Sequence, residues 1–259
     1  MPEKSLKSKG VLISAVFAVI LVPAVLLLSA HMGNRNYYIA GVLIMVIAMI
    51  PFFAGFESRK PEARELVTIA VMCAIAVISR IVFLPLQGFK PILGIVMITG
   101  LSFGPSAGFL TGAMSAFVSN FVFGQGSWTP WQMFAFGIAG FLAGVLSGKG
   151  PFKPEVRLPE TMKCRGLIAT ILKRLPLSIC GFLMIILIVG PLLDTCTLFT
   201  MTETVNKQSA AAVYLAGLFP VNIIHGAAVF LTLFFLAVPI TEKLDRIKIK
   251  YGMTGTSVR

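Results

Sequence analysis

Long stretches without a charged residue are the feature that most restricts what this chain can fold into. A helix rises about 1.5 Å per residue, so about 20 apolar residues cross the hydrocarbon core of a membrane. Val11–Ala30 and Tyr37–Gly55 meet this requirement without a charge, and Leu66–Leu84 contains only Arg80. Only 12% of the residues are charged, whereas about 25% is usual in soluble domains. We therefore expect an all-α integral membrane protein and not a soluble enzyme.

The apolar stretch Ile92–Phe123 decides the number of spans. As one helix it would be about 48 Å long, too long for a membrane without severe tilt, and Gly104–Pro105 interrupts it. As two helices it brings the total to eight, with Pro130–Gly148, Gly166–Gly190 and Ala211–Val238 as the remaining spans. Eight spans place both termini and most of the 22 Lys and Arg residues on one side, which the positive-inside rule identifies as cytoplasmic.

The net charge of +12 follows from this topology. Lys and Arg on the cytoplasmic side are attracted to the inner leaflet, so the expected partner of these cations is the lipid bilayer and not nucleic acid. The expected organisation is an N-terminal transmembrane hairpin (1–58), a six-helix core (59–240) and a basic cytoplasmic tail (241–259).

Glycine recurs every four residues within Ile92–Phe123, at Gly100, Gly104, Gly108 and Gly112. Residues four apart lie on one face of a helix, and small residues there let helix backbones approach closely. The pattern predicts tight packing in a helical bundle, in which neighbours shield the short helix before Gly104.

The sequence lacks the motifs that would power or catalyse a reaction. It has no GxxxxGK[ST] loop for nucleotide phosphates and no GxSxG or HExxH motif. Its 4 cysteines form no CxxC pair, so no metal, other cofactor or catalytic residue is expected. The acidic residues are all expected in loops, tails or helix ends, with Asp194 in a long outer loop over Pro191–Ala210. A carrier without an acidic relay in the membrane would take its energy from another subunit.

The most distinctive stretch is FGQGSWTPWQM, Phe123–Met133, on the expected outer face. It holds both tryptophans of the chain, Trp128 and Trp131. Aromatic faces beside neutral hydrogen-bonding groups suit a pocket for a flat, mostly uncharged ligand, and the polar groups here are Asn120, Gln125, Thr129 and Gln132. Thr129 is also placed to cap the following helix. The alternative is that the tryptophans only anchor the chain at the membrane interface.

Further polar residues are expected at the same outer face. The loop that carries Gln87 and Lys90 could cover the pocket. Arg80 lies about one turn below this loop and either extends to the outer surface or meets an anionic group. Asn222 and His225 in the last span lie on one helix face, where they either join the pocket or bond to neighbouring helices.

Together these features resemble the substrate-binding (S) component of an energy-coupling factor (ECF) transporter. The resemblance rests on a basic segment leading into a helix with the small-residue motif Ala70-x-x-x-Ala74, on the Gly-rich helix pair that follows, and on the FGQGSWTPWQM loop. It covers roughly residues 60–240 as six helices, so the N-terminal hairpin is an addition to the six-helix pattern.

The resemblance implies a binding subunit without catalytic activity in the plasma membrane of a bacterium or archaeon. A vitamin or related micronutrient would bind at the outer loops, Gln87–Lys90 and Asn120–Gln132, with Asn222 and His225 contributing from the last helix. A cobalamin-like corrinoid is the favoured ligand, while riboflavin-like, pyrimidine and queuosine-type ligands remain open.

The resemblance also implies partners. Ala70 and Ala74 would dock on a membrane coupling subunit that is joined to two cytoplasmic ATPases. Two other functions stay open: a stand-alone secondary transporter of a small organic solute that uses Arg80 and His225, and a structural or lipid-handling membrane protein whose Trp-rich loop is only an anchor.

Overall fold

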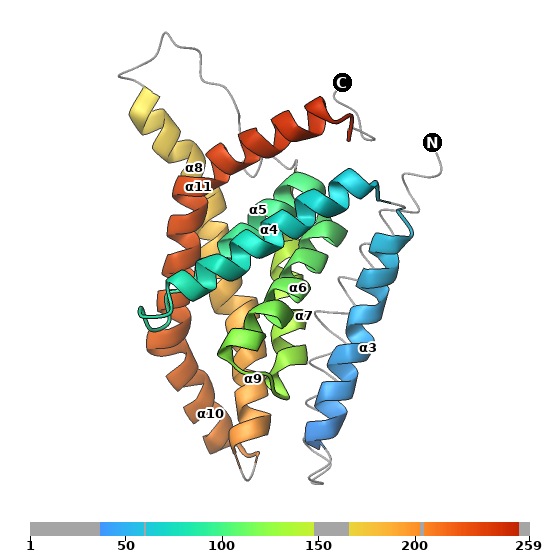
Figure 1. Ribbon diagram of the computed structural model, residues 1–259. Coiled ribbons are helices and arrows are strands. Elements are labelled where there is room, and N and C mark those ends of the chain that lie inside the picture. Colours follow the sequence, from blue (N-terminus) through green and yellow to red (C-terminus); the bar gives the residue numbers. More distant parts are fainter. Residues whose placement is uncertain (1–36, 60, 148–165, 203–204, 254–259) are drawn as a thin grey trace.

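The described part of the chain is built from helices joined by short connections. The computed structural model describes residues 37–59, 61–147, 166–202 and 205–253, and no strand occurs among them. Figure 1 shows α5, α6 and α7 at the centre, with α4 crossing obliquely in front of them and α3 along one side. The helices are α3 (Tyr37–Glu57), α4 (Ala63–Val82), α5 (Ile92–Phe103), α6 (Pro105–Phe123), α7 (Trp128–Leu146), α8 (Gly166–Met184), α9 (Gly190–Met201), α10 (Lys207–Ala216) and α11 (Ile223–Lys250). The π-helical segments η4 (Ile185–Val189) and η5 (Gly217–Asn222) join α8 to α9 and α10 to α11.

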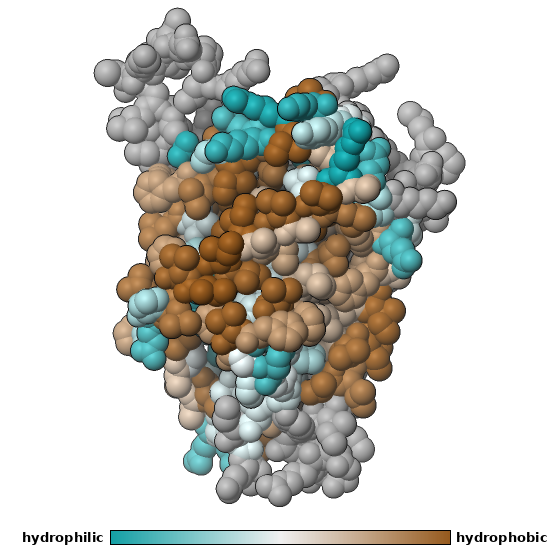
Figure 2. Space-filling view, in the orientation of Figure 1, coloured by the Kyte–Doolittle hydropathy of each residue, from teal (hydrophilic) through white to brown (hydrophobic). Residues whose placement is uncertain are grey.

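Within these residues, five helical stretches are long and apolar enough to cross a membrane, and two shorter apolar helices accompany them. Figure 2 shows hydrophobic residues as a broad brown band across the molecule, with hydrophilic residues gathered at the end where α11 ends. The chain is therefore an all-α membrane protein, as the sequence predicts. The expected first span, Val11–Ala30, lies outside the described residues. The long stretches are Ala63–Val82, Pro105–Phe123, Trp128–Leu146, Arg174–Thr200 and Lys207–Lys250, and the shorter helices are Gly41–Glu57 and Ile92–Phe103.

The break expected at Gly104–Pro105 is confirmed, because α5 ends and α6 begins on either side of Gly104. Gly104 has a φ of +91°, a conformation that glycine adopts without the steric cost of a side chain. Every residue from Ile92 to Leu101 is buried. Neighbouring helices therefore shield α5 from lipid, as the short span requires.

Two cations hold the carboxyl end of α5. Arg59 Nη1 donates a hydrogen bond of 3.2 Å to the carbonyl oxygen of Phe103, and Lys248 Nζ donates to that of Ser102. The Lys248 amine also lies 4.7 Å from the centroid of the Phe103 ring. The last carbonyls of a helix lack intrahelical partners and favour positive charge. Donors from the segment before α4 and from α11 therefore satisfy the last carbonyl groups of the short helix.

Glycines set the packing of α5, α6 and α7, as the four-residue repeat predicts. A Cβ atom on either Gly100 or Gly108 would overlap the carbonyl oxygen of Gly140, and one on Gly140 would overlap that of Gly108. Backbone atoms cannot move aside as a flexible side chain can. The three helices reach this spacing only because these positions lack a side chain.

α3, the second helix of the expected N-terminal hairpin, packs against α6, α7 and α9. Its Phe52 ring stacks on Phe109 of α6, with 4.1 Å between the ring centroids and an interplanar angle of 8°. Met45 and Ala48 are buried in the same apolar cluster. α3 does not cover Ala70 or Ala74 of α4, which are exposed.

The expected outer loop over Pro191–Ala210 is wrong, because α9 and α10 occupy most of it. Pro191 stands in the first turn of α9, directly after the π-helical segment η4. Asn206 caps α10, and its side chain accepts a hydrogen bond of 2.8 Å from the Ser209 amide. Asp194 consequently lies in a helix and not in a loop.

Candidate functional site

Arg80, near the carboxyl end of α4, extends into the bundle and not to the surface. Its side chain is 4% exposed. Nη1 donates hydrogen bonds to Ser119 Oγ and, at 3.0 Å, to Asn120 Oδ1 on α6. The guanidinium lies 4.3 Å from the Phe123 ring centroid and 5.8 Å from that of Phe136. Extension of Arg80 to the outer surface, one of the two alternatives, is therefore wrong, because partners on α6 draw the side chain inward.

Asn120 continues this polar network into the loop before α7. Its Nδ2 donates a hydrogen bond of 3.1 Å to Thr129 Oγ1. The same hydroxyl accepts from the Gly126 amide at 3.2 Å and donates to Gln125 Oε1 at 2.9 Å. Gln125 Nε2 donates to a backbone carbonyl of α6. The expectation that Thr129 caps α7 is wrong, because Ser127 is the N-cap residue and Thr129 ties the loop to α6 instead.

The two tryptophans have different surroundings. Trp128 is 38% exposed, and its Nε1 donates to the carbonyl oxygen of Gly124 at 3.3 Å. Trp131 is 2% exposed and meets Phe199 of α9 edge to face, with 5.9 Å between centroids. Trp131 is thus a core residue in this structure, and Trp128 alone offers an open aromatic surface. Gln132 is partly buried, and its Oε1 has no hydrogen-bond partner.

The loop between α4 and α5 packs onto α11. The rings of Phe83 and Phe89 lie 5.2 Å apart at their centroids. Gly88 adopts a φ of +83°. A Cβ atom added to Gly88 would lie 3.3 Å from the side chain of Ile224 in α11. Gln87 is exposed on this loop. The loop that follows α4 therefore contacts the beginning of α11.

Arg80, Lys90 and His225 form what we call the basic cluster. Lys90 ends the loop and is partly buried; burial, and then the charge of Arg80, lower the pKa of its amine. His225 of α11 is 6% exposed, and the residue before it, Ile224, lies against Gly88 of the same loop. His225 Nε2 has no hydrogen-bond partner.

Asn222 has a different partner, although it lies one turn from His225. Its Nδ2 donates a hydrogen bond of 2.8 Å to Asp194 Oδ2, and both side chains are buried. Asp194 belongs to the apolar stretch Arg174–Thr200. The expectation that every acidic residue lies in a loop, a tail or a helix end is therefore wrong for Asp194.

The structure thus brings only part of the expected site together. Asn120, Gln125 and Thr129 form one network with Arg80, and the basic cluster adds two further side chains. Sequence reasoning missed Ser119 and kept a binding role for Arg80 only as an alternative, although a lone charge in an apolar span is itself a signal of function. Among the described residues, no group of three His, Cys, Asp or Glu side chains comes together to hold a metal ion.

α4 presents its small residues on the outside of the bundle. Ala70 and Ala74 are both exposed, and apolar neighbours such as Val71 and Ile78 are 52% and 57% exposed. Figure 2 shows hydrophobic surface where Figure 1 shows α4. Small residues on an exposed helix face let a second helix approach closely.

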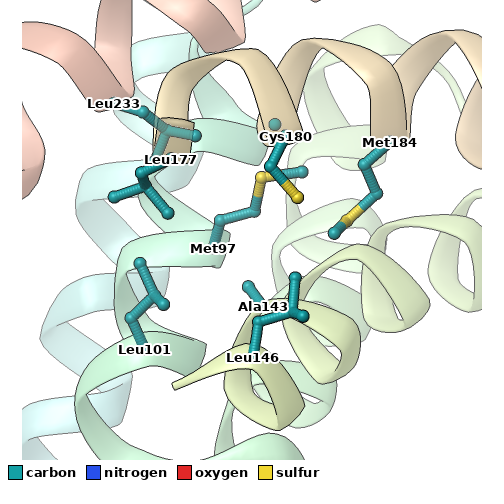
Figure 3. A pocket seen from close by; sticks show the side chains of 9 residues that line it. Met97, Leu101, Ala143, Leu146, Leu177, Cys180, Met184 and Leu233 are labelled. Atoms are coloured by element: carbon teal, nitrogen blue, oxygen red, sulfur yellow. The ribbon is translucent and has the colours of Figure 1, made fainter. Parts of the chain in front are cut away.

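A small apolar cavity lies elsewhere, between α5, α7, α8 and α11 (Figure 3). Its side chains, such as Leu101 and Met184, offer no charged group. Leu101 is close to the carboxyl end of α5, whereas Lys90 precedes the amino end. The cavity is therefore not part of the polar network.

No match was found among curated proteins or among solved structures. The family model for the "ECF transporter, substrate-specific component" matches residues 64–238, more than half of the chain. The matched range begins in α4 and ends in α11, so it includes Arg80, the Trp-rich loop and His225. The chain therefore belongs to the family of substrate-specific components of ECF transporters.

Proposed function

We propose that this chain is the subunit that binds a vitamin or related micronutrient for an ECF-type importer. The observation that carries the proposal is the convergence of buried polar groups from α4, α6, α7 and α11 on one end of the bundle. Arg80, Asn120 and Thr129 are hydrogen-bonded in series, and His225 of α11 is buried with its Nε2 unpartnered. Small-molecule sites place a few polar groups of this kind within apolar walls. No catalytic step is assigned to any of these residues.

The ligand class follows from the aromatic and neutral groups around this network. Trp128 offers a half-open ring for stacking, and Gln132 supplies an acceptor that lacks a partner. Gln87 is open to an incoming molecule. Asn222, one turn before His225, is held in place by its hydrogen bond to Asp194. These groups suit a ring-bearing vitamin, and the preference for a corrinoid among such vitamins rests on the family resemblance alone.

The energy for uptake would come from other subunits. The chain has no nucleotide-binding motif, so we assign that role to two cytoplasmic ATPases and a membrane coupling subunit. The exposed Ala70–Ala74 face of α4 is the docking surface in this proposal. The topology that accompanies it has eight spans, with both termini on the cytoplasmic side of a bacterial or archaeal plasma membrane.

Co-purification tests the proposal. The chain is expressed with a coupling subunit and its ATPases, and the purified material is analysed by mass spectrometry for proteins and small molecules. Ala70→Leu with Ala74→Leu should abolish recovery of the coupling subunit and leave the bound small molecule in place. Ala54→Leu, at an exposed position on α3, is the control that should change neither. Unchanged recovery of the coupling subunit with the double variant would contradict the docking surface.

A stand-alone secondary transporter is the second candidate, and Asp194 is the observation that favours it. Buried acids in membrane helices are kept for function more often than for stability, and this one lies in a membrane-length apolar stretch. The test uses the chain alone in liposomes. Uptake that requires a proton gradient and is lost with Asp194→Asn supports the transporter, whereas binding without uptake supports the binding subunit.

A further inference from the structure

The buried charge of Arg80 is only partly compensated. Its partners Ser119 and Asn120 are neutral, and its Nε has no hydrogen-bond partner. In the described residues no carboxylate forms an ion pair with Arg80. Aromatic rings contribute some stabilisation of a desolvated guanidinium, but they do not neutralise it.

Lys90 increases this local positive charge, because its amine and the Arg80 guanidinium repel each other. Lys90 ends the loop whose Gly88 lies against Ile224, the residue before His225, and His225 adds a buried imidazole there. Among the described residues Asp194 forms no ion pair with either cation; its carboxylate accepts a hydrogen bond from Asn222. α5 begins two residues after Lys90, and the amino end of a helix adds positive potential near that point.

A buried charge without a counter-charge is costly unless something pairs with it. Here the cluster comes from three elements: α4, the following loop and α11. Arg80 Nε and His225 Nε2 are buried and without partners. The guanidinium of Arg80 and the ammonium of Lys90 can both donate to a carboxylate or a phosphate, which accepts several hydrogen bonds at once.

We infer that the basic cluster of Arg80, Lys90 and His225 is the binding site for an anionic group, a carboxylate or a phosphate ester, on the molecule this chain holds. For a transported solute, the inference rests on the proposed function and narrows the substrate to acidic micronutrients. The same chemistry is present in the headgroup of an anionic lipid, and the experiment below separates the two sources.

The first arm measures binding of matched acidic and neutral compounds. The full chain is placed in nanodiscs of phosphatidylcholine, and dissociation constants are measured for three pairs. The pairs are pantothenate and panthenol, biotin and biotinamide, and riboflavin 5′-phosphate and riboflavin. At least one acidic member should bind about 10- to 100-fold more tightly than its neutral partner, as expected for hydrogen bonds to a charged group.

Substitutions assign this preference to the cluster. Arg80→Gln and Lys90→Gln should each remove most of the preference for the acidic member. Arg64→Gln is the matched control, because Arg64 lies on the same helix but is exposed at its other end, where it bonds to the Tyr251 carbonyl. Lys90 lies in a loop, so Lys90→Gln remains informative even when Arg80→Gln does not fold. Equal binding of both members of each pair by the wild type overturns the inference.

The second arm does not depend on which vitamin binds. Sodium phosphate, compared with chloride at equal ionic strength, should raise the melting temperature of the wild type but not of Lys90→Gln. An equal rise in both, with no acidic preference in the panel, overturns the inference. Native mass spectrometry then identifies the source. An anionic phospholipid that the wild type retains and Arg80→Gln loses means that the anionic site holds a lipid headgroup.

The outcomes for this inference and for the proposed function are separable. A wild type that binds a neutral vitamin and co-purifies with a coupling subunit retains the proposed function and overturns the anionic site. Anion binding that depends on Arg80, without recovery of any coupling subunit, retains the anionic site and overturns the proposed function.

Discussion

The side-chain amide of Asn120 on α6 donates a hydrogen bond of 3.1 Å to the hydroxyl of Thr129 in the first turn of α7. Since Asn120 also accepts from Arg80, this bond connects the basic cluster to the Trp-rich loop. The Thr129 hydroxyl serves two donors and one acceptor, so it determines how the loop sits on the bundle.

Thr129→Val should therefore destabilise the fold and weaken ligand binding together. The substitution keeps the shape of the side chain but leaves the buried Asn120 amide without an acceptor, at a cost of about 1–3 kcal/mol. The free energy of unfolding in detergent and the recovery of bound small molecule are the measurements.

Thr111→Val is the control for this prediction. Thr111 is also buried, but its hydroxyl donates only to the Ala107 carbonyl within the same helix. Its loss should cost about 1 kcal/mol or less. Equal effects of Thr111→Val and Thr129→Val would show that the polar network adds nothing beyond burial of a hydroxyl.

Gly108→Ala should destabilise the bundle more than most single substitutions do. The added methyl group meets the backbone of Gly140, so α6 and α7 must separate, at a cost of about 1–3 kcal/mol or more. Gly55→Ala is the matched control, because a Cβ atom there meets nothing within 4 Å and alanine favours helix. A lower melting temperature for Gly108→Ala and an unchanged or higher one for Gly55→Ala are expected; similar values would contradict the close approach of the helices.

Local signals were enough to predict most of the fold. Gly104–Pro105 marked the end of α5 because glycine there needs a positive φ and proline fits a first helical turn. The loop expected over Pro191–Ala210 was wrong, because most of that range is helical in α9 and α10. α9 and α10 contain polar residues such as Asp194 and Lys207, and these obscure the apolar composition by which a spanning helix is recognised in a sequence.

The candidate site was harder to predict because its contacts join distant parts of the chain. Residue type alone indicated Asn120, Gln125 and Thr129. Which way Arg80 extends depends on Ser119, 39 positions later. The burial of Trp131 likewise depends on Phe199, which lies in a helix that the sequence did not predict.

Lys248→Met should loosen the carboxyl end of α5. The substitution removes the donor to the Ser102 carbonyl and the charge over the Phe103 ring, and we expect a loss of about 1–2 kcal/mol. Hydrogen exchange should become faster in the last turn of α5. Lys243→Met, at an exposed position on the same helix, should leave exchange unchanged; faster exchange in both variants would point to a general effect of lost charge.

Lys90 should make the stability of the chain without ligand rise with pH. Burial, and then the charge of Arg80, lower the pKa of its amine in the folded chain below the ordinary value of 10.5. Between these two pKa values the unfolded chain binds more protons than the folded chain, so the free energy of unfolding increases as pH rises. Melting temperatures measured across this alkaline window should rise more steeply for the wild type than for Lys90→Gln, while Lys243→Gln should follow the wild type. Saturating phosphate should reduce the rise, because an anion in the basic cluster favours the charged amine. Parallel pH profiles for the wild type and Lys90→Gln would mean that the Lys90 amine is neither buried nor held beside Arg80.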